Sequence, residues 1–257
     1  MNNTKFEIAT HIGNRKSNQD VLMVNGKVPY EEIPASLYAI EEKTEGIYPF
    51  GVFDGMGGEL KGDEVAYMLA SHIQNAFSEQ KFDDISQAKD FLMEKLDEAH
   101  KLVSKKFWNN AGTTVTVCIV YDDEYFLINI GDSPAFLVSE DKIEELTRRQ
   151  NLAWYRKERG EPFSKWDEST LLHCVGIGSY LPSDVAHIHH GQLNDGDMLI
   201  ICSDGITNHY DDNELREAID KLTLKEITDN AILEVNADNC TVIAYKHQEK
   251  KTEVQNE

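Results

Sequence analysis

The sequence predicts an α+β fold in which antiparallel sheets carry helices on their outer faces. The first observation behind this prediction is that strand-like and helix-like segments come in blocks rather than in strict alternation. The second is that 40% of the 257 residues are hydrophobic, enough for a sizeable core, while no Pro/Gly/Ser-rich linker or internal repeat interrupts the chain. We therefore expect one domain over residues 1–245 and a polar, disordered tail over 246–257.

Three strands and two long helices are expected in the N-terminal half. Strands are predicted at 6–12 and 20–24, and an apolar strand at 48–53 follows an acidic stretch that we interpret as a surface excursion. Apolar residues recur with helical spacing over 63–77 and over 86–107. Each of these segments therefore predicts a helix with one stripe of side chains facing the core.

A hairpin and further short elements are expected in the C-terminal half. Residues 113–121 alternate between apolar and polar, and an apolar segment resumes at 125–130 after the turn residues Asp122 and Asp123. This pattern predicts an antiparallel hairpin. The remaining predictions are strands at 135–138, 185–188, 198–202 and 241–245 and helices at 213–221 and 224–235.

The charge balance and the cysteines restrict the possible partners and compartment. The chain has 25 Lys and Arg against 46 Asp and Glu, a net charge of −21 that repels phosphate backbones and anionic membranes. We therefore expect no nucleic acid as partner. We expect no membrane as partner either, because in addition no apolar run approaches the about 18 residues of a membrane span. Cys118, Cys174, Cys202 and Cys240 lack CxxC spacing, which favours reduced, buried thiols in a cytoplasmic protein.

Acidic residues stand at the ends of several predicted strands. Asp54, Asp132 and Asp204 each follow an apolar strand, and Asp238 precedes one. A single such residue is most simply explained as part of a turn. Four carboxylates, with no His or Cys among them, form a set of hard oxygen ligands, which suits Mg²⁺ or Mn²⁺. Two such ions, about 3.5 to 4 Å apart, could activate a water against a phosphorus or carbonyl centre.

Six segments also resemble, in order and spacing, the metal-dependent serine/threonine phosphatases of the PPM/PP2C family, particularly its bacterial members. These segments are RKSNQD at 15–20, VFDGMGG at 52–58, GTT at 112–114, NIGDS at 129–133, CSDG at 202–205 and DNCTV at 238–242. The resemblance runs from about residue 6 to residue 245. It implies a four-layer αββα sandwich, in which two antiparallel sheets are flanked by helices.

The resemblance also implies a set of site residues. Asp54 would bridge two metal ions, the carbonyl of Gly55 would complete one side, and Asp20 would anchor metal-bound water. Arg15 matches the phosphate-binding arginine, whose planar guanidinium can hold two phosphate oxygens. The implied catalytic residues are Arg15, Asp20, Asp54, Asp204 and Asp238, and the implied metal ligands are Asp20, Asp54, Gly55, Asp204 and Asp238, with Asp132 at a third site.

The chain departs from the family pattern at three positions. Gln19 stands where many members have a carboxylate, which removes a charge near the site. Met56 stands where many eukaryotic members have His, so protonation of the leaving group would have to come from metal-bound water. Asn208 stands where members with a third metal usually carry Asp, which weakens a third site built on Asp132.

The segment 147–178 corresponds to the family's flap beside the catalytic cleft. It combines aromatic residues with basic ones inside an acidic chain. Two interpretations stay open at this point: a helix that packs its aromatic residues on the body and keeps a solvated basic face, or a surface for a phosphorylated protein. The basic and aromatic residues concerned are Arg148, Arg149, Arg156, Lys157, Arg159 and Lys165 with Trp154, Tyr155 and Trp166.

Together, the residues and the resemblance predict a cytoplasmic, Mg²⁺- or Mn²⁺-dependent protein phosphatase with two bound ions. It would hydrolyse phosphoserine and phosphothreonine by attack of a metal-bridged water or hydroxide, and its partner would be a phosphorylated protein produced by a serine/threonine kinase. Two alternatives stay open: a catalytically silent binding module with the same fold, and a metal-dependent hydrolase of small phosphate esters. The presence of Asp20, Asp54, Asp204 and Asp238 argues against the silent module.

Overall fold

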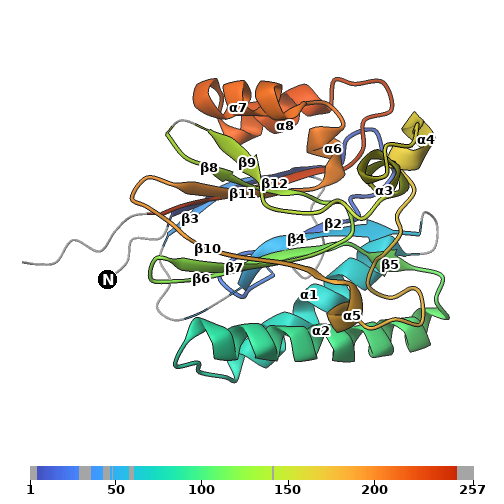
Figure 1. Ribbon diagram of the computed structural model, residues 1–257, viewed down its shortest axis with the longest axis vertical. Helices are drawn as coiled ribbons and strands as arrows, with labels where there is room; N and C mark the ends of the chain where they lie inside the picture. The colour runs from blue at the N-terminus through green and yellow to red at the C-terminus, as the bar shows by residue number, and fades with distance from the viewer. Residues whose placement is uncertain are drawn as a thin grey trace, which may run out of the picture.

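The computed structural model describes residues 5–28, 36–42, 47, 49–57, 61–140 and 142–247. Its strands form two antiparallel sheets that lie face to face, with helices on both outer sides (Figure 1). The predicted four-layer αββα sandwich is therefore confirmed. None of the helices within the described ranges combines the length and the apolar composition that crossing a membrane requires.

The first sheet brings together strands from both ends of the chain. In order across the sheet it contains β3 (Ser36–Glu42), β1 (Lys5–His11), β12 (Cys240–Lys246), β11 (Met198–Cys202), β8 (Ala135–Val138) and β9 (Ile143–Glu145). Because β12 lies between β1 and β11, the N-terminal strand pairs directly with the last strand described, from Lys5 opposite Lys246 to His11 opposite Cys240.

The second sheet carries the predicted hairpin at its centre. Its order is β10 (His187–Gln192), β7 (Glu124–Ile130), β6 (Val115–Tyr121), β4 (Pro49–Met56) and β2 (Asp20–Met23), and the short β5 (Gly112–Thr113) pairs with the end of β4. In the pairing of β2 with β4, Asp20 lies directly opposite Asp54. This register places two of the predicted site residues side by side.

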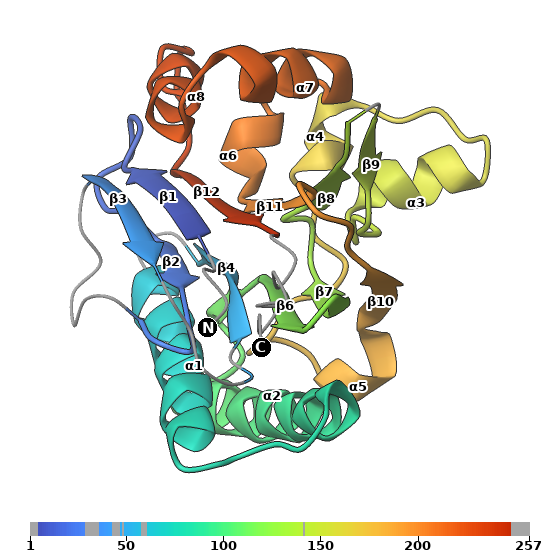
Figure 2. The ribbon, with the colours of Figure 1, turned by 90° about the vertical axis from the view of Figure 1, so that its left-hand side faces the viewer.

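Helices cover the outer face of each sheet (Figure 2). The helices α1 (Gly62–Ser78), α2 (Ile85–Phe107) and α5 (Pro182–Val185) lie against the second sheet, and α7 (Asp212–Lys221) and α8 (Leu224–Ala231) lie against the first (Figure 1). The short α6 (Asp204–Thr207) follows β11. Two further short helices, α3 (Leu152–Glu158) and α4 (Lys165–Glu168), belong to the segment predicted as the flap.

Three hydrophobic clusters fill the spaces between these layers. Phe6, Phe50 and Tyr245 meet between the sheets, with ring centroids 5.0 to 5.4 Å apart. The alternation predicted for β6 is observed, because Val115, Val117 and Ile119 face the cluster under α1 and α2 while Cys118 faces the cluster between the sheets. The third cluster joins the first sheet to α7 and α8.

Three predictions about short elements were wrong, and one short strand was not predicted. Part of the expected acidic excursion is a strand, β3, which pairs with the free edge of β1. The predicted strand at 185–188 is split, because Pro182 begins the helix α5 and the strand begins only at His187. Helix α8 ends at Ala231 rather than at Val235, and the strand β9 was not predicted.

The first two residues assigned to the predicted tail belong to the folded body. Strand β12 runs through Lys246, and the side chain of His247 is buried, with its Nε2 3.1 Å from Oδ1 of Asp123. Residues 248–257, the rest of the predicted tail, lie outside the described residues.

Candidate metal and phosphate site

The predicted site residues come from both sheets. Asp20 begins β2 and Asp54 lies in β4 of the second sheet, whereas Asp204 begins α6 directly after β11 of the first. Asp238 precedes β12, which pairs with β11 in the same sheet. The fold therefore gathers carboxylates that are up to 218 residues apart in the chain (238 − 20) at one place in the sandwich.

These carboxylates lie close enough to affect one another's protonation. Loss of hydration is the largest cause that raises the pKa of Asp54 well above its ordinary value, followed by the charges of Asp20 and Asp204 and then of Asp132 and Asp238. Burial raises the pKa of Asp20 to about 7, with Asp238 and Asp204 adding to the effect. Burial and the charge of Asp238 raise the pKa of Asp204, while its hydrogen bonds with Asn208 and Asp54 lower it.

Asp20 has one satisfied and one unsatisfied oxygen. The hydroxyl of Ser203 donates to its Oδ2 at 2.7 Å, and a hydrogen bond from Thr241 also lowers its pKa. The other oxygen, Oδ1, is buried and has no hydrogen-bond partner in the structure. A buried carboxylate oxygen without a donor is costly, and a bound cation or a water would satisfy it.

The backbone of Asp54 and Gly55 is held by neighbouring segments. The carbonyl of Asp54 accepts from the amide of Thr114 at 2.8 Å and from the hydroxyl of Thr113 at 3.0 Å. The amide of Gly55 donates to the carbonyl of Gln19 at 3.1 Å. A side chain at Gly55 would place its Cβ 2.4 Å from the carbonyl oxygen of Gly62, so only glycine allows this close approach of the chain.

Arg15 reaches the same group of carboxylates. Its Nη2 donates to Oδ2 of Asp238 at 2.6 Å, and its side chain is 55% exposed. The side-chain amide of Asn239 holds the loop that carries Arg15, because it donates to the carbonyls of Ile12 at 2.8 Å and Ser17 at 3.0 Å. Its Oδ1 also accepts from the amide of Gln19 at 2.8 Å. Asn239 therefore anchors the loop as well as following the Asp238 turn.

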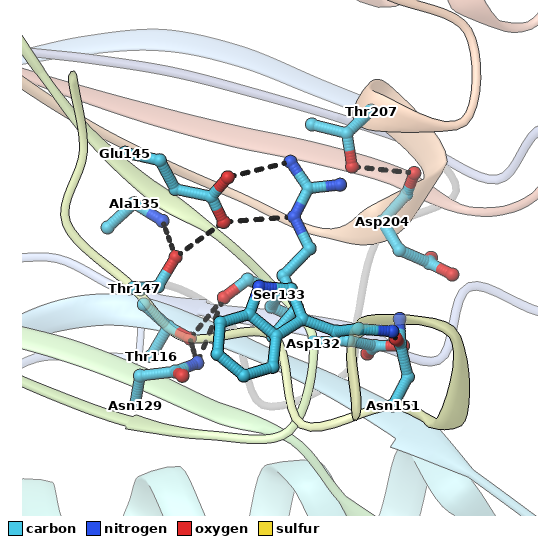
Figure 3. Close-up of polar contacts among 12 residues, drawn as sticks. Thr116, Asn129, Asp132, Ser133, Ala135, Glu145, Thr147, Asn151, Asp204 and Thr207 are labelled. Atoms are coloured by element: carbon cyan, nitrogen blue, oxygen red, sulfur yellow. Dashed lines mark hydrogen bonds and ion pairs between the residues drawn. The ribbon is translucent and has the colours of Figure 1, made fainter. Parts of the chain in front are cut away.

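Asp132 lies near Asp204 (Figure 3), and the side chain of Asn208 contacts Asp204. Burial, followed by the charge of Asp204, raises the pKa of Asp132 to about 7. Nδ2 of Asn151 approaches Asp132 Oδ2 at 3.5 Å, and the side chain of Asn151 also caps the start of α3 by accepting from the amide of Trp154. Nδ2 of Asn208 donates to Asp204 Oδ2 at 3.2 Å, so this amide occupies the place expected of a further acidic ligand.

The donor set fits hard divalent cations. It consists of carboxylate oxygens and the carbonyl of Gly55, with mutual repulsion that a cation would offset. Among the described residues, no three His, Cys, Asp or Glu side chains are arranged so that they could hold an ion in the positions shown. The carboxylates of Asp204 and Asp238 are engaged by Asn208 and Arg15, and they would have to exchange these partners for a metal.

Two clefts open beside the carboxylates. The larger, of about 660 Å³, is lined by Asp132, Asp204, Trp154, Lys157 and Tyr210 among others. The smaller, of about 470 Å³, runs past Arg15 and Asp238. Sequence reasoning missed His209, which lines both clefts and whose Nδ1 lies 3.1 Å from Glu234 Oε1. Its place four residues after the CSDG segment was the available signal.

The basic residues of the flap are largely paired with carboxylates. Arg148 pairs with Glu158 and lies over the ring of Trp154, with its guanidinium carbon 4.5 Å from the ring centroid. The other ion pairs are Arg149–Glu145, Arg156–Asp167 and Arg159–Glu161, at 2.9, 3.4 and 3.0 Å. The positive charge of the flap is thus mostly neutralised by these carboxylates. The interpretation that the aromatic residues pack on the body does not hold for Trp166 of α4, which is exposed.

Protein phosphatases from other bacteria are similar to this chain in sequence. Serine/threonine phosphatase stp from Listeria innocua is 28% identical over 209 residues, covering 75% of this chain and 81% of that protein. Protein phosphatase PhpP from Streptococcus pneumoniae is 23% identical over 214 residues, covering 78% of this chain and 86% of that protein.

Solved structures share the architecture at lower identity. The serine/threonine phosphatase of S. agalactiae superposes with a TM-score of 0.79 over 95% of this chain and all of that one, at 19% identity. The catalytic domain of the phosphatase PstP, solved with two manganese ions, gives a TM-score of 0.74 at 16% identity, over 97% of this chain and all of that one.

The fold and the relatives are those of a phosphoprotein phosphatase. The family model for protein phosphatase 2C matches residues 38–231, and this chain belongs to that family. The resemblance to this family is confirmed by the match, which covers three quarters of the chain and four of the six segments.

The raised pKa values predict how metal-free protein responds to pH. The pKa of Asp20 and of Asp132 is about 7 when folded, above the ordinary value of 3.8, so the folded state holds these protons more tightly than the unfolded chain. Their contribution to stability is complete below about pH 4 and is lost as the pH rises through about 7. In EDTA, the melting temperature should fall between about pH 5 and pH 8, and Mn²⁺ should restore it most strongly at the higher pH.

Two variants separate this effect from that of the net charge. Asp20→Asn removes one of the titrating groups and should flatten the pH dependence of the melting temperature in EDTA. Asp90→Asn changes an exposed carboxylate on α2 and should leave the slope unchanged. Parallel curves for wild type and Asp20→Asn would show that Asp20 does not carry the pH dependence.

Proposed function

We propose that this protein is a Mg²⁺- or Mn²⁺-dependent phosphatase that removes phosphate from phosphoserine and phosphothreonine in proteins. The observation that carries the proposal is the cluster of Asp20, Asp54 and Asp204, whose pKa values are raised by burial and by one another's charge. Such a cluster requires positive charge to be stable when ionised, and Arg15 at its margin offsets only part of the negative charge.

The residues that would hold the ions are those gathered at the sheet ends. Asp54, with Asp20 and the Gly55 carbonyl on one side and Asp204 and Asp238 on the other, would hold two ions, and Asp132 would contribute to a third. When bound, the ions would supply a nucleophile by lowering the pKa of water and would neutralise charge on the phosphoryl group. The two manganese ions in the PstP structure support this number of tight sites.

Arg15 would bind the phosphate of the substrate. Its guanidinium already contacts a carboxylate of the cluster at 2.6 Å, so a phosphoryl group placed against the same carboxylates would be within its reach. The fork of the guanidinium can donate to two phosphate oxygens at once. Because Asn239 fixes the loop from Ile12 to Gln19, Arg15 projects from an anchored rather than a free segment.

The proposed partner is a phosphorylated protein produced by a serine/threonine kinase. The names of the relatives from Listeria and Streptococcus support a substrate of this class. We further propose that the protein acts in the cytoplasm, because all four cysteines are free and buried, as expected in a reducing compartment. A silent binding module would have no need of the unsatisfied carboxylate oxygen at Asp20.

Release of phosphate from a phosphothreonine peptide tests this function. The purified protein is assayed with malachite green in Mn²⁺ and then in excess EDTA. Release that depends on the metal is expected. Release from p-nitrophenyl phosphate without release from any phosphopeptide would instead favour a hydrolase of small phosphate esters, and no release from either would favour a binding module.

Asp54→Asn should abolish turnover while the protein stays folded. One side chain would serve both ions, so its loss removes both the activation of water and the compensation of charge. The same change removes one of several repelling charges, so the metal-free variant should melt at a higher temperature than wild type at about pH 8. Asp90→Asn serves as the control for both readouts. Two bound Mn²⁺ by calorimetry together with near-normal activity would refute the assignment.

Arg15→Ala should chiefly weaken substrate binding. A charged hydrogen bond contributes about 1.5 to 3 kcal/mol, so kcat/KM for a phosphopeptide should fall about 10- to 150-fold, mostly through KM. Arg15→Lys keeps the charge but loses the planar guanidinium, so its kcat/KM should lie between those of the wild type and Arg15→Ala. Lys16→Ala, at the neighbouring exposed cation, should change kcat/KM little. An unchanged kcat/KM in Arg15→Ala would place this residue outside the site.

Asn208→Asp should lower the Mn²⁺ concentration needed for half-maximal activity severalfold. The amide donates to Asp204, and a carboxylate in its place would add a charged ligand beside Asp132 and Asp204. The exposed Asn213 on α7 provides the matched control, because Asn213→Asp adds the same charge away from the carboxylates. Superimposable titrations of wild type and Asn208→Asp would mean that Asp132 binds no metal and only stabilises the turn at the end of its strand.

A further inference from the structure

Two large, exposed apolar side chains line the cleft that contains Arg15. Trp166 of α4 is 83% exposed and Val235 is 88% exposed, and both border the 470 Å³ cleft together with Arg15 and Asp238. An apolar residue exposed to this degree contributes little to folding, whereas it gains free energy when a partner covers it. Its position beside the proposed phosphate contact therefore needs an explanation from binding.

Exposure alone does not mark this surface. Trp108, at the end of α2, is 82% exposed, and Leu233, just after α8, is 79% exposed, but neither lines either cleft. What distinguishes Trp166 and Val235 is that they come from segments 69 residues apart (235 − 166) and meet at one cleft with Arg15 from a third segment. Convergence of this kind is typical of a binding site.

Local interactions hold the wall of the cleft that carries Trp166 in place. The carboxylate of Asp167 accepts from the amide and hydroxyl of Ser164 at 2.7 and 2.9 Å and pairs with Arg156 at 3.4 Å, so the short helix that carries Trp166 is tied to the flap. Among the described residues, no aromatic ring or cation is stacked on Trp166. Val235 lies three residues before Asp238, which contacts Arg15.

We propose that Trp166 and Val235 form a subsite for a large apolar side chain adjacent to the phosphoserine or phosphothreonine of a protein substrate. This inference rests on the proposed phosphatase function and adds a sequence preference to it. The cleft has a volume within the range of about 300 to 1,000 Å³ found for ligand sites. It is continuous with Arg15, so a peptide whose phosphate meets this guanidinium would lay a flanking residue along the cleft.

The chemistry of the cleft favours a peptide over a second copy of this chain. With a net charge of −21, two copies repel each other over their whole surfaces, whereas a short phosphopeptide carries little charge besides its phosphate. Lys165 and Arg15 line the cleft beside Glu168 and Glu234, so both signs of charge are available at the rim around the apolar walls. Trp is also among the residues that most often dominate binding interfaces.

The experiment compares phosphothreonine peptides that differ at one position. Each pair carries Leu or the similarly sized Asn immediately before or immediately after the phosphothreonine, and kcat/KM is measured for each in Mn²⁺. Wild type should prefer Leu at one of these positions by about 5- to 20-fold, the gain expected from partly covering an apolar side chain. In Trp166→Ala this ratio should fall to about 1 to 2, and in Val235→Ala it should fall part of the way.

Two matched variants act as controls. Leu233→Ala shortens a similarly exposed side chain near the cleft, and Trp108→Asn replaces an exposed Trp whose left-handed backbone, with φ of 56°, asparagine tolerates. Both should keep the wild-type preference.

The outcomes separate this inference from the proposed function. No release of phosphate from any peptide or from p-nitrophenyl phosphate would refute the phosphatase function itself. Normal activity with equal kcat/KM for Leu and Asn peptides, or a preference that survives in Trp166→Ala, would refute the subsite. A wild-type dimer in light scattering that Trp166→Ala converts to monomer, with no peptide preference, would assign the cleft to a second copy of the chain and also refute it.

Discussion

The structure depends on the confinement of several carboxylates at one edge of a sandwich. Asp20 lies opposite Asp54 in one sheet, and like charges placed directly opposite destabilise a pair of strands. The surrounding protein offsets only part of this repulsion, through the hydroxyl of Ser203, the amide of Asn208 and the guanidinium of Arg15. Because this offset is incomplete, the folded state favours protonated carboxylates or a bound cation over a fully ionised cluster.

The rest of the sandwich makes this confinement possible. Three hydrophobic clusters hold the layers, and β12 joins the first strand to β11, so that Asp238 and Asp204 are fixed at the same end of one sheet. Thr113 and Thr114 then hold the backbone of Asp54 in the other sheet. The carboxylates thus lie in or next to strand ends, which favours a constant geometry.

The sequence allowed the long elements to be predicted and left the short ones uncertain. The helices α1 and α2 lie within one residue of their predicted ends, because their stripes are long and their caps are local, as at Asp84. The strand β3 and the end of α8 were missed because long-range pairing and packing decide them. Likewise, the site aspartates could be named from their motifs, but the anchoring role of Asn239 depends on contacts with residues more than 200 positions away.

The flap and the turn that carries Asp132 are connected by hydrogen bonds. The amide of Gln150 donates to the carbonyl of Gly131 at 2.8 Å, and its side chain accepts from the amide of Gly131 and donates to the carbonyl of Val185. These bonds join the start of the flap to the turn that carries Asp132. Asn151 extends the connection, because its side-chain nitrogen approaches Asp132 while its side-chain oxygen caps α3. These hydrogen bonds fix the start of the flap and α3 against the turn that carries Asp132, so that this wall of the larger cleft is positioned by direct contacts with the turn.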